Sequence, residues 1–135
     1  MIESQIRYRN GYKYQLAADY FCALEFKPCS EITSEFIELD TNGVLYLHRG
    51  YAWDGPSGPA LDTKSFMRAS LVHDALYQLI GMELLPKKCK PLADMEMRRI
   101  CIEDGMSRIR AWYTFKAVQV FGGNHLTTKP VISAP

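Results

Sequence analysis

Cysteine is scarce in this sequence: its 135 residues include four cysteines, and no two of them form a C-x-x-C pair. A disulfide-stabilised domain of this size needs more cysteines, and zinc knuckles need closer spacing. We therefore expect four reduced, mostly buried thiols. A zinc site built from Cys22, Cys29 and a histidine is disfavoured, because six residues separate the two cysteines.

Long hydrophobic runs and an excess of one charge are also missing. No segment approaches the about 18 to 20 consecutive apolar residues that a transmembrane helix needs. The first residues, Met1-Ile2-Glu3-Ser4-Gln5, are polar and acidic, unlike the start of a secretory signal. Sixteen Lys and Arg against fifteen Asp and Glu give a net charge of +1, which excludes a global attraction to nucleic acid or to an anionic membrane, so that either would need a local patch. We expect a protein without a signal peptide or a transmembrane segment, made for the cytosol.

The composition is that of an ordinary globular protein, with 47% hydrophobic, 12% aromatic and 23% charged residues. Apolar side chains are abundant enough to offset the chain entropy lost on folding, so extensive disorder is excluded. A chain of this length supports one core, and we expect a single domain over residues 1–135. Its predicted parts are a β-rich half, a Gly/Pro loop, a helical half and a tail, at residues 1–51, 52–65, 66–122 and 123–135.

The first half has the short, alternating, aromatic-rich pattern of β-strands. Strands are predicted within residues 12–16, 20–26, 32–39 and 44–47. Asp40-Thr41-Asn42-Gly43 separates the last two segments, and Asn-Gly readily adopts the positive φ angles of a tight hairpin turn. These features predict a small antiparallel sheet.

The second half has the pattern of helices. Residues 66–80 are apolar almost all round, which predicts a central, buried helix with Gly81 as its C-terminal stop. A second helix is expected over about residues 91–104 and a third over residues 108–121, each followed by glycine. The predicted fold class is α+β, with a small N-terminal antiparallel sheet packed on three C-terminal helices.

Two polar residues interrupt the first of these helices. His73 and Asp74 stand in the otherwise apolar segment 69–77, and burying an imidazole beside a carboxylate is costly unless partners or a metal satisfy both. His73 and Tyr77 are four residues apart and share a helix face, while Asp74 points about 100° away round the axis. A short connection brings the second helix back antiparallel, so Asp94 can orient His73 and fix its tautomer. The pattern predicts a His-Asp general base.

The middle of the chain carries three motifs in order: Trp53-Asp54-Gly55-Pro56-Ser57-Gly58-Pro59, Ala69-Ser70-Leu71-Val72-His73-Asp74-Ala75-Leu76-Tyr77 and Ala93-Asp94. Together with Tyr113 and the segment 118–122, these motifs resemble a family of uncharacterised tailed-phage proteins, defined only as a domain of unknown function. The resemblance implies a bacteriophage protein in the cytoplasm of an infected bacterium or associated with the virion. It implies no activity.

The same region is similar, more distantly, to the secreted phospholipase A₂ enzymes. Those enzymes carry a Tyr-Gly-rich calcium loop, a helix with His-Asp-x-x-Tyr, and a later helix whose Asp orients the histidine. This chain has Tyr51, a glycine-containing loop, the helical His73-Asp74-Ala75-Leu76-Tyr77 and Asp94 in the same order. The similarity implies that His73 activates water, that Asp94 orients His73, and that Tyr77 supports both.

The similarity to phospholipase A₂ also implies a metal ion and a substrate. Asp74, together with Asp54 and with loop carbonyls near Trp53, Gly55 and Gly58, would hold Ca²⁺. Oxygen ligands suit this ion, which would polarise the ester carbonyl of a lipid substrate.

Each of these features has a second interpretation. His73 and Asp94 also suit a buried structural pair, with Tyr77 packed in the core. The loop after Trp53 also suits a structural turn, and Asp54, His73, Asp74 and Asp94 together suit Mg²⁺ or a transition metal. Ser57 lacks the strand-turn-helix setting of a hydrolase nucleophile.

Basic residues are frequent in the last two predicted helices, at Arg98, Arg99, Arg108, Arg110 and Lys116. Aromatic residues lie among them, which is one pattern of nucleic-acid binding. A solvated helix face beside a core face explains the pattern more simply, so nucleic acid is not an expected partner. His48 has no recognisable context and is assigned no role.

The sequence therefore predicts a small phage-encoded hydrolase with a phospholipase-A₂-like His-Asp site. It would act on ester bonds of envelope lipids, with Ca²⁺ or another divalent cation. The alternative is a non-catalytic phage accessory protein, either a virion or tail component or a binder of a host defence protein. In that alternative, the same residues form a buried structural network.

Overall fold

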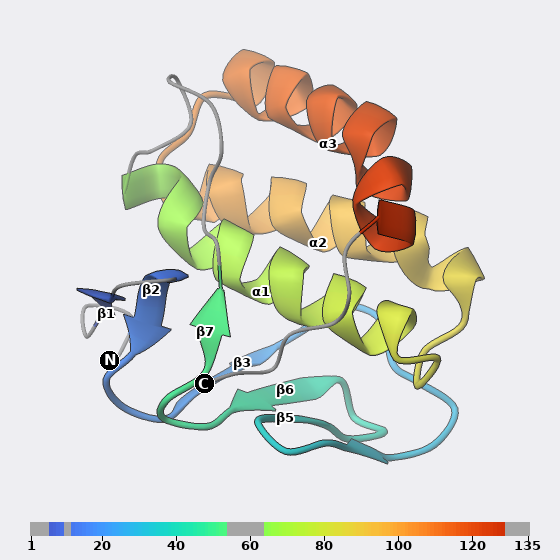
Figure 1. Ribbon diagram of the computed structural model, residues 1–135. Coiled ribbons are helices and arrows are strands. Elements are labelled where there is room, and N and C mark those ends of the chain that lie inside the picture. The colour runs from blue at the N-terminus through green and yellow to red at the C-terminus, as the bar shows by residue number, and fades with distance from the viewer. Residues whose placement is uncertain (1–5, 10–11, 54–63, 129–135) are drawn as a thin grey trace. The chain divides into compact units, whose positions relative to one another are not determined.

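The computed structural model describes residues 6–9, 12–53 and 64–128 (Figure 1). The chain divides into two compact units, and the division falls between Asp54 and Gly55. Among the described residues, the first unit contains the strands and the second contains the helices. The N-terminal antiparallel sheets followed by three α-helices confirm the predicted α+β class.

The strand unit contains two antiparallel sheets rather than the single sheet expected. The three-stranded sheet has the order β1-β2-β7, formed by Ile6–Arg9, Tyr12–Leu16 and Ala52–Trp53. On the central strand β2, Tyr14 and Leu16 are buried. The Trp53 ring stacks on Tyr14 and on Tyr51, with ring centroids 5.4 and 6.3 Å apart. Tyr14 and Trp53 thus stack as direct partners across the β2-β7 pair.

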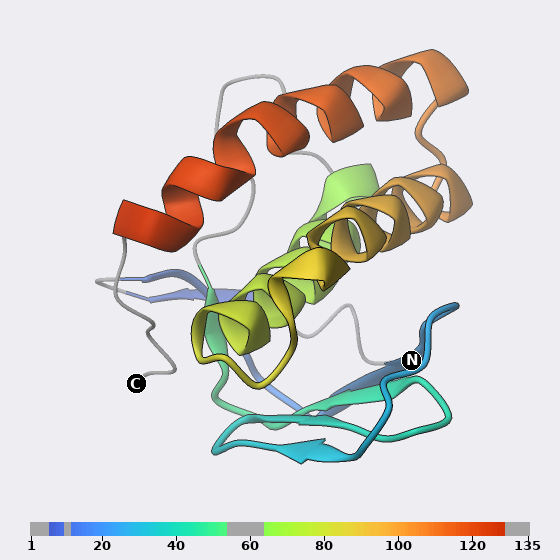
Figure 2. The ribbon, with the colours of Figure 1, turned by 90° about the vertical axis from the view of Figure 1, so that its right-hand side faces the viewer.

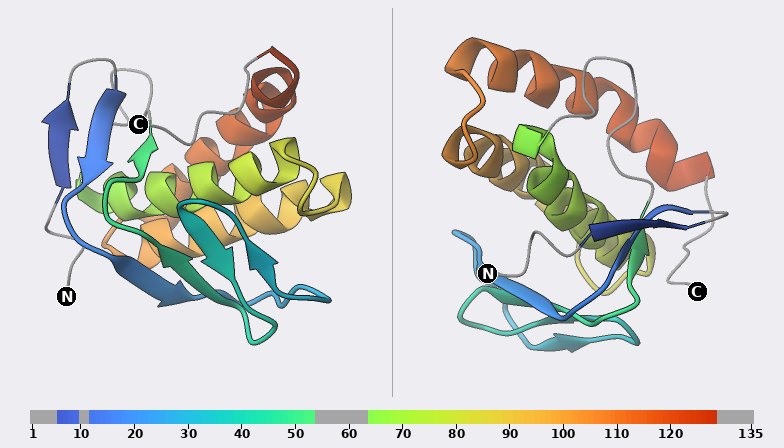
Figure 3. Two further views of the ribbon diagram at one scale, coloured as in Figure 1. Left: turned by 60° about the horizontal axis from the view of Figure 1, so that its bottom comes forward. Right: turned by 90° about the vertical axis from the view of Figure 1, so that its left-hand side faces the viewer.

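The four-stranded sheet has the order β3-β6-β5-β4, formed by Tyr20–Ala23, Val44–Leu47, Ile37–Leu39 and Ile32–Thr33 (Figure 3). Its inward-facing leucines and isoleucines alternate with more exposed residues, as the period of two in a strand requires. The predicted strand over residues 32–39 is two short strands. The reason is a local turn: the Ser34 N–H donates to the Ile37 carbonyl, and the Ile37 N–H donates to the Ser34 hydroxyl.

The turn between β5 and β6 uses the predicted Asp40-Thr41-Asn42-Gly43 segment. The Gly43 N–H donates to the Asp40 carbonyl at 3.0 Å, and the Asp40 carboxylate accepts bonds from the N–H groups of Asn42 and Val44 at 2.9 Å each. Gly43 has a φ of 87°, whereas Asn42 does not share the positive φ expected of it. A Cβ at Gly43 would lie 2.7 Å from the Phe26 carbonyl oxygen, so both conformation and space require glycine here.

The helical unit consists of α1 (Lys64–Gly81), a short 3₁₀ helix η1 (Lys87–Cys89), α2 (Lys90–Glu103) and α3 (Arg108–Thr128). α1 and α2 run antiparallel side by side, and α3 packs on α2 (Figures 1 and 2). α2 starts at Lys90, one residue before its predicted start, and Pro91 takes one of the first two helical positions. Most positions of α1 from Ala69 to Ile80 are buried, and Asp74 and Gln78 lie on its narrow, more exposed stripe.

The ends of α1 and α2 share one hydrogen-bond pattern. After α2, the Gly105 N–H donates to the Ile102 carbonyl and the Met106 N–H donates to the Cys101 carbonyl, with Gly105 at a φ of 106°. After α1, the residue in the corresponding left-handed position is Glu83, with a φ of 65°, and not the predicted Gly81. Gly81 is the last helical residue instead. Both helices thus end in a Schellman motif, but one of them has a side chain where glycine is favoured.

α3 continues beyond its predicted end at Phe121 to Thr128, so the predicted tail at 123–135 begins as helix. The helix passes through Gly122 and Gly123 without stopping. Each glycine costs a helix about 1 kcal/mol relative to alanine, a penalty that neighbouring helical residues can outweigh. No helix among the described residues is long and apolar enough to cross a membrane.

Candidate functional site

The polar residues singled out from the sequence come together between α1 and α2. α1 positions His73, Asp74 and Tyr77, and α2 positions Asp94. Asp94 belongs to the inward stripe of α2, which also includes Ala93 and Met97 and is set by the helical period. His73, Tyr77 and Asp94 are 7%, 4% and 3% exposed, so the three form a buried polar cluster within the helical unit.

Asp94 joins the other two buried groups through one oxygen. Its Oδ1 lies 2.8 Å from Nε2 of His73 and accepts a hydrogen bond from the Tyr77 hydroxyl at 2.7 Å. A carboxylate accepts but does not donate, so Nε2 of His73 must carry a proton. The predicted contact between His73 and Asp94 is therefore present, and it fixes the tautomer of neutral His73.

Tyr77 packs directly against the ring of His73 on the same face of α1. The two ring centroids are 4.1 Å apart, with the planes tilted by 36°. Burial, together with the hydrogen bond to Asp94, raises the pKa of Tyr77 above its ordinary value, so the hydroxyl stays protonated and remains a donor. Tyr77 thus restrains both the ring of His73 and the carboxylate of Asp94.

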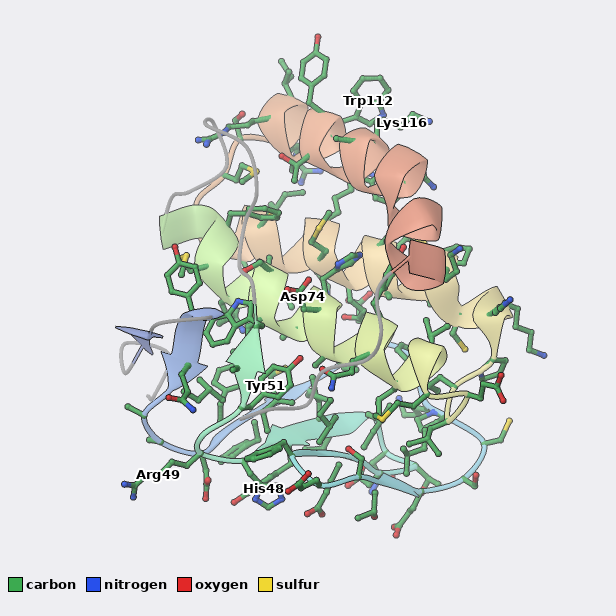
Figure 4. All side chains as sticks on the ribbon, in the orientation of Figure 1. His48, Arg49, Tyr51, Asp74, Trp112 and Lys116 are labelled. Atoms are coloured by element: carbon green, nitrogen blue, oxygen red, sulfur yellow. The ribbon has the colours of Figure 1, made fainter. Side chains whose placement is uncertain are left out.

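Asp74 faces the other ring nitrogen of His73. Its Oδ1 lies 3.8 Å from Nδ1, too far for a direct hydrogen bond but suitable for a bridge through one water. The Asp74 side chain is 31% exposed, and the residue lies near the middle of α1 (Figure 4). Among the described residues, Nδ1 has no direct hydrogen bond, so the unprotonated nitrogen of neutral His73 is directed toward the carboxylate that reaches solvent.

The pKa of His73 is raised above its ordinary value of 6.5. Burial, the strongest single influence, opposes protonation, but the interactions with Asp74 and Asp94 together outweigh it. His73 therefore holds its proton to a higher pH than a free imidazole, and it can accept a proton only above that raised value.

A second polar network, which the sequence interpretation missed, also joins α1 to α2. Arg68 contacts Glu103 at 2.8 Å and Asp104 at 3.0 Å. Arg99 contacts the buried Glu96 at 2.6 Å and Glu103 at 2.7 Å. Arg99 is three residues from Glu96 and four from Glu103, a spacing from which ion pairs on the helix could have been predicted. The charge of Arg99 is therefore balanced by acidic partners, and this network lies outside the His73 cluster.

Only Trp53 and Asp74 of the predicted metal ligands lie among the described residues. Asp54, Gly55 and Gly58 lie outside the described residues. Trp53 belongs to the strand unit, where its ring is buried against Tyr14 and Tyr51. Within residues 6–9, 12–53 and 64–128, no three His, Cys, Asp or Glu side chains group as a cation site. Asp74 is the partly exposed carboxylate at the His73 cluster that suits a cation ligand, and the Ca²⁺ site stays a prediction.

The strand unit has its own polar contacts on the four-stranded sheet. Nε2 of His48 lies 2.7 Å from a carboxylate oxygen of Glu38, and the Tyr46 hydroxyl donates to Asp19 at 2.8 Å. The bond from the Arg49 N–H, followed by the one from Tyr46, lowers the pKa of Asp19. These cross-strand pairs are exposed or half-buried, as in an ordinary sheet face.

All four cysteines are free thiols, as expected, but the prediction that they are mostly buried is wrong: Cys89 and Cys101 are buried, Cys22 is half-buried and Cys29 is exposed. Burial raises the pKa of Cys101 to about 12, which keeps this thiol protonated.

The two resemblances drawn from the motifs remain predictions. Comparison of the chain with protein families, with curated proteins and with solved structures finds no match.

Proposed function

We propose that the helical unit carries the general-base site of a hydrolase, in which Nδ1 of His73 takes a proton from an attacking water. The observation that carries this proposal is that the two ring nitrogens of His73 have different partners. Nε2 is occupied by Asp94 at 2.8 Å, and Nδ1 is left facing the partly exposed Asp74 at 3.8 Å. A water that bridges this gap would be held between a base and a carboxylate.

The residues around His73 have distinct parts in the proposed reaction. Asp94 accepts from Nε2–H and stabilises the imidazolium that forms when Nδ1 takes the proton. Tyr77 holds Asp94 in place through its hydroxyl and limits rotation of the His73 ring. Asp74 orients the water toward Nδ1. The water oxygen then attacks the acyl carbon of an ester, and the proton on Nδ1 is passed to the departing alkoxide.

Lipid esters are the proposed substrate class, on the strength of the similarity to phospholipase A₂. If a divalent cation takes part, it would polarise the ester carbonyl, and Asp74 is the described carboxylate that would help to hold it. The proton transfers assigned to His73 and Asp94 do not depend on that cation.

The enzyme proposal is tested with chromogenic esters and phospholipids, using two substitutions of one residue. His73→Gln places an amide NH₂ near the position of Nε2, so the bond to Asp94 can persist while the base is lost. His73→Ala removes both. We expect hydrolysis by the unsubstituted protein and none by either variant. The melting temperature of His73→Gln should be close to that of the unsubstituted protein. Hydrolysis that survives in His73→Gln would rule out His73 as the base.

One observation favours a second function, that of a non-catalytic phage accessory protein. His73, Tyr77 and Asp94 are almost fully buried, as in a network that specifies a helix pairing rather than a reaction site. The protein would then act as a virion or tail component or as a binder of a host defence protein. In that case no ester would be hydrolysed at any pH, and His73→Ala would cost far more stability than His73→Gln.

A further inference from the structure

The outward side of α3 exposes large apolar and aromatic side chains. Ile109 is 73% exposed, Tyr113 is 65% exposed and Trp112 is 45% exposed. Together with Lys116 they follow the spacing of one helix face, with steps of three and four residues. These four residues are named the α3 outer face. Figure 4 shows Trp112 and Lys116 projecting from the side of α3 that is turned away from α2.

The opposite side of α3 already has its partner. Ala111 and Thr114 are buried, and the Thr114 hydroxyl donates to the Arg110 carbonyl at 3.0 Å and lies 3.9 Å from the Met106 sulfur. α3 therefore has a buried side that packs on α2 and an opposite side with large exposed apolar residues. A cluster of exposed apolar side chains beside polar residues is typical of a surface that meets a partner or a membrane.

Within the α3 outer face, Trp112 contacts both Tyr113 and Lys116. The rings of Trp112 and Tyr113 meet edge to face at a centroid distance of 5.4 Å. The Lys116 ammonium lies 5.8 Å from the centre of the Trp112 ring. Such contacts keep the aromatic rings ordered and leave their apolar surfaces available to a partner.

The charge of α3 indicates the sign of the charge that a partner would carry. The helix contains Arg108, Arg110 and Lys116 and no Asp or Glu, although the whole chain has a net charge of only +1. Positive charge is therefore concentrated on α3, and an anionic partner is favoured. A second copy of this chain is disfavoured, because a two-fold interface would bring the same basic helix against itself.

We infer that the α3 outer face attaches the protein to the surface of an anionic lipid bilayer. Isoleucine with tryptophan and tyrosine suits the boundary between headgroups and acyl chains, where aromatic rings are enriched. Lys116 and the arginines of the first turn would meet lipid phosphates at the rim. Three positive charges give few phosphate contacts for nucleic acid, whereas the exposed isoleucine suits lipid. The inference rests on α3 alone, although a membrane surface would also present the lipid esters of the proposed function.

Cosedimentation with vesicles tests this attachment. We expect binding to vesicles of equal parts phosphatidylglycerol and phosphatidylcholine, weaker binding to phosphatidylcholine alone, and a loss of binding as salt is added. Ile109→Asp should weaken binding at least tenfold, because it removes an inserted apolar group and adds a negative charge. Lys116→Ala should weaken it about fivefold.

Two further variants serve as controls. Met95→Asp makes the same change in charge at a helical residue of α2 that is 57% exposed, and it should bind like the unsubstituted protein. His73→Gln should also bind normally, so that failure of the hydrolase proposal and failure of the lipid proposal can be told apart. Tryptophan emission should shift to shorter wavelength with anionic vesicles, and Trp112→Phe should abolish the shift because the other tryptophan, Trp53, is buried.

Three outcomes would overturn the inference. The first is a lack of binding to anionic vesicles by the unsubstituted protein. The second is an equal loss in Ile109→Asp and Met95→Asp, which would indicate a general effect of charge. The third is a dimer in solution that Ile109→Asp dissociates, with no vesicle binding, which would assign the α3 outer face to a second copy of the chain.

Discussion

Asp94 should contribute far more to stability than Asp74, although both are carboxylates beside His73. Asp94 is 3% exposed and accepts two hydrogen bonds, from His73 at 2.8 Å and from Tyr77 at 2.7 Å. Asp74 lies 3.8 Å from His73 and its side chain is 31% exposed. Removing one partner of a buried, hydrogen-bonded ion pair costs about 3–5 kcal/mol.

The magnitude expected for Asp94→Ala follows from these contacts. Each hydrogen bond to a charged group contributes about 1.5–3 kcal/mol, and the substitution also leaves a buried imidazole and a buried hydroxyl without an acceptor. We expect a loss of about 3–5 kcal/mol for Asp94→Ala. Asp74→Ala should lose no more than about 1 kcal/mol, as is usual for a partly exposed ion pair.

Urea unfolding followed by helical circular dichroism measures both variants in the unit that contains the substitutions. The midpoint should fall strongly for Asp94→Ala and slightly for Asp74→Ala, with similar slopes. Equal losses for the two variants, or a loss below about 1 kcal/mol for Asp94→Ala, would refute the assignment of Asp94 as the acceptor that holds the cluster together.

Three further predictions concern turns and protonation. In chemical denaturation, Glu83→Gly should stabilise the protein by about 1 kcal/mol and Gly105→Ala should destabilise it by about the same amount, because both positions have a positive φ. No atom would contact a Cβ at Gly105, so the cost there is conformational. Unchanged denaturation midpoints would contradict the Schellman motifs at the two helix ends. Gly43→Ala should lower the free energy of unfolding by about 2 kcal/mol or more in the same measurement, since the added Cβ would lie 2.7 Å from a carbonyl oxygen. An unchanged free energy of unfolding would mean that the turn has another conformation. The raised pKa of His73 means that folding favours the protonated ring, so this stabilisation is complete below the ordinary pKa of 6.5 and is lost as pH rises through the raised pKa. Urea midpoints should fall across that window in the unsubstituted protein and stay flatter in His73→Gln, and identical pH profiles would contradict the shift.

The cluster around His73 was predictable because local rules determine most of it. A polar pair in an apolar helix must find partners, and the period of the helix places His73 and Tyr77 on one face. The short connection between α1 and α2 then brings Asp94 within reach. The bond from Tyr77 to Asp94 needed the actual separation of the two helices, which residue spacing does not supply.

The features that escaped prediction depend on non-local contacts or on competing local preferences. Division of the strands into two sheets depends on which strands pair, and pairing is decided by packing rather than by propensity. Glu83 adopts a conformation that favours glycine because the Schellman bonds after α1 require it. The exposure of the α3 outer face was not predicted, since the sequence pattern suited a helix with these apolar residues on its core side.

The most direct test of the His73 site is the protonation of its two ring nitrogens, followed by ¹⁵N NMR across a pH titration. We expect a pKa of His73 above 6.5 and, above that pKa, a neutral ring with its proton on Nε2 and none on Nδ1. The His73→Gln variant identifies the signals. A neutral ring with its proton on Nδ1 would contradict the bond to Asp94, and with it the assignment of Nδ1 as the base.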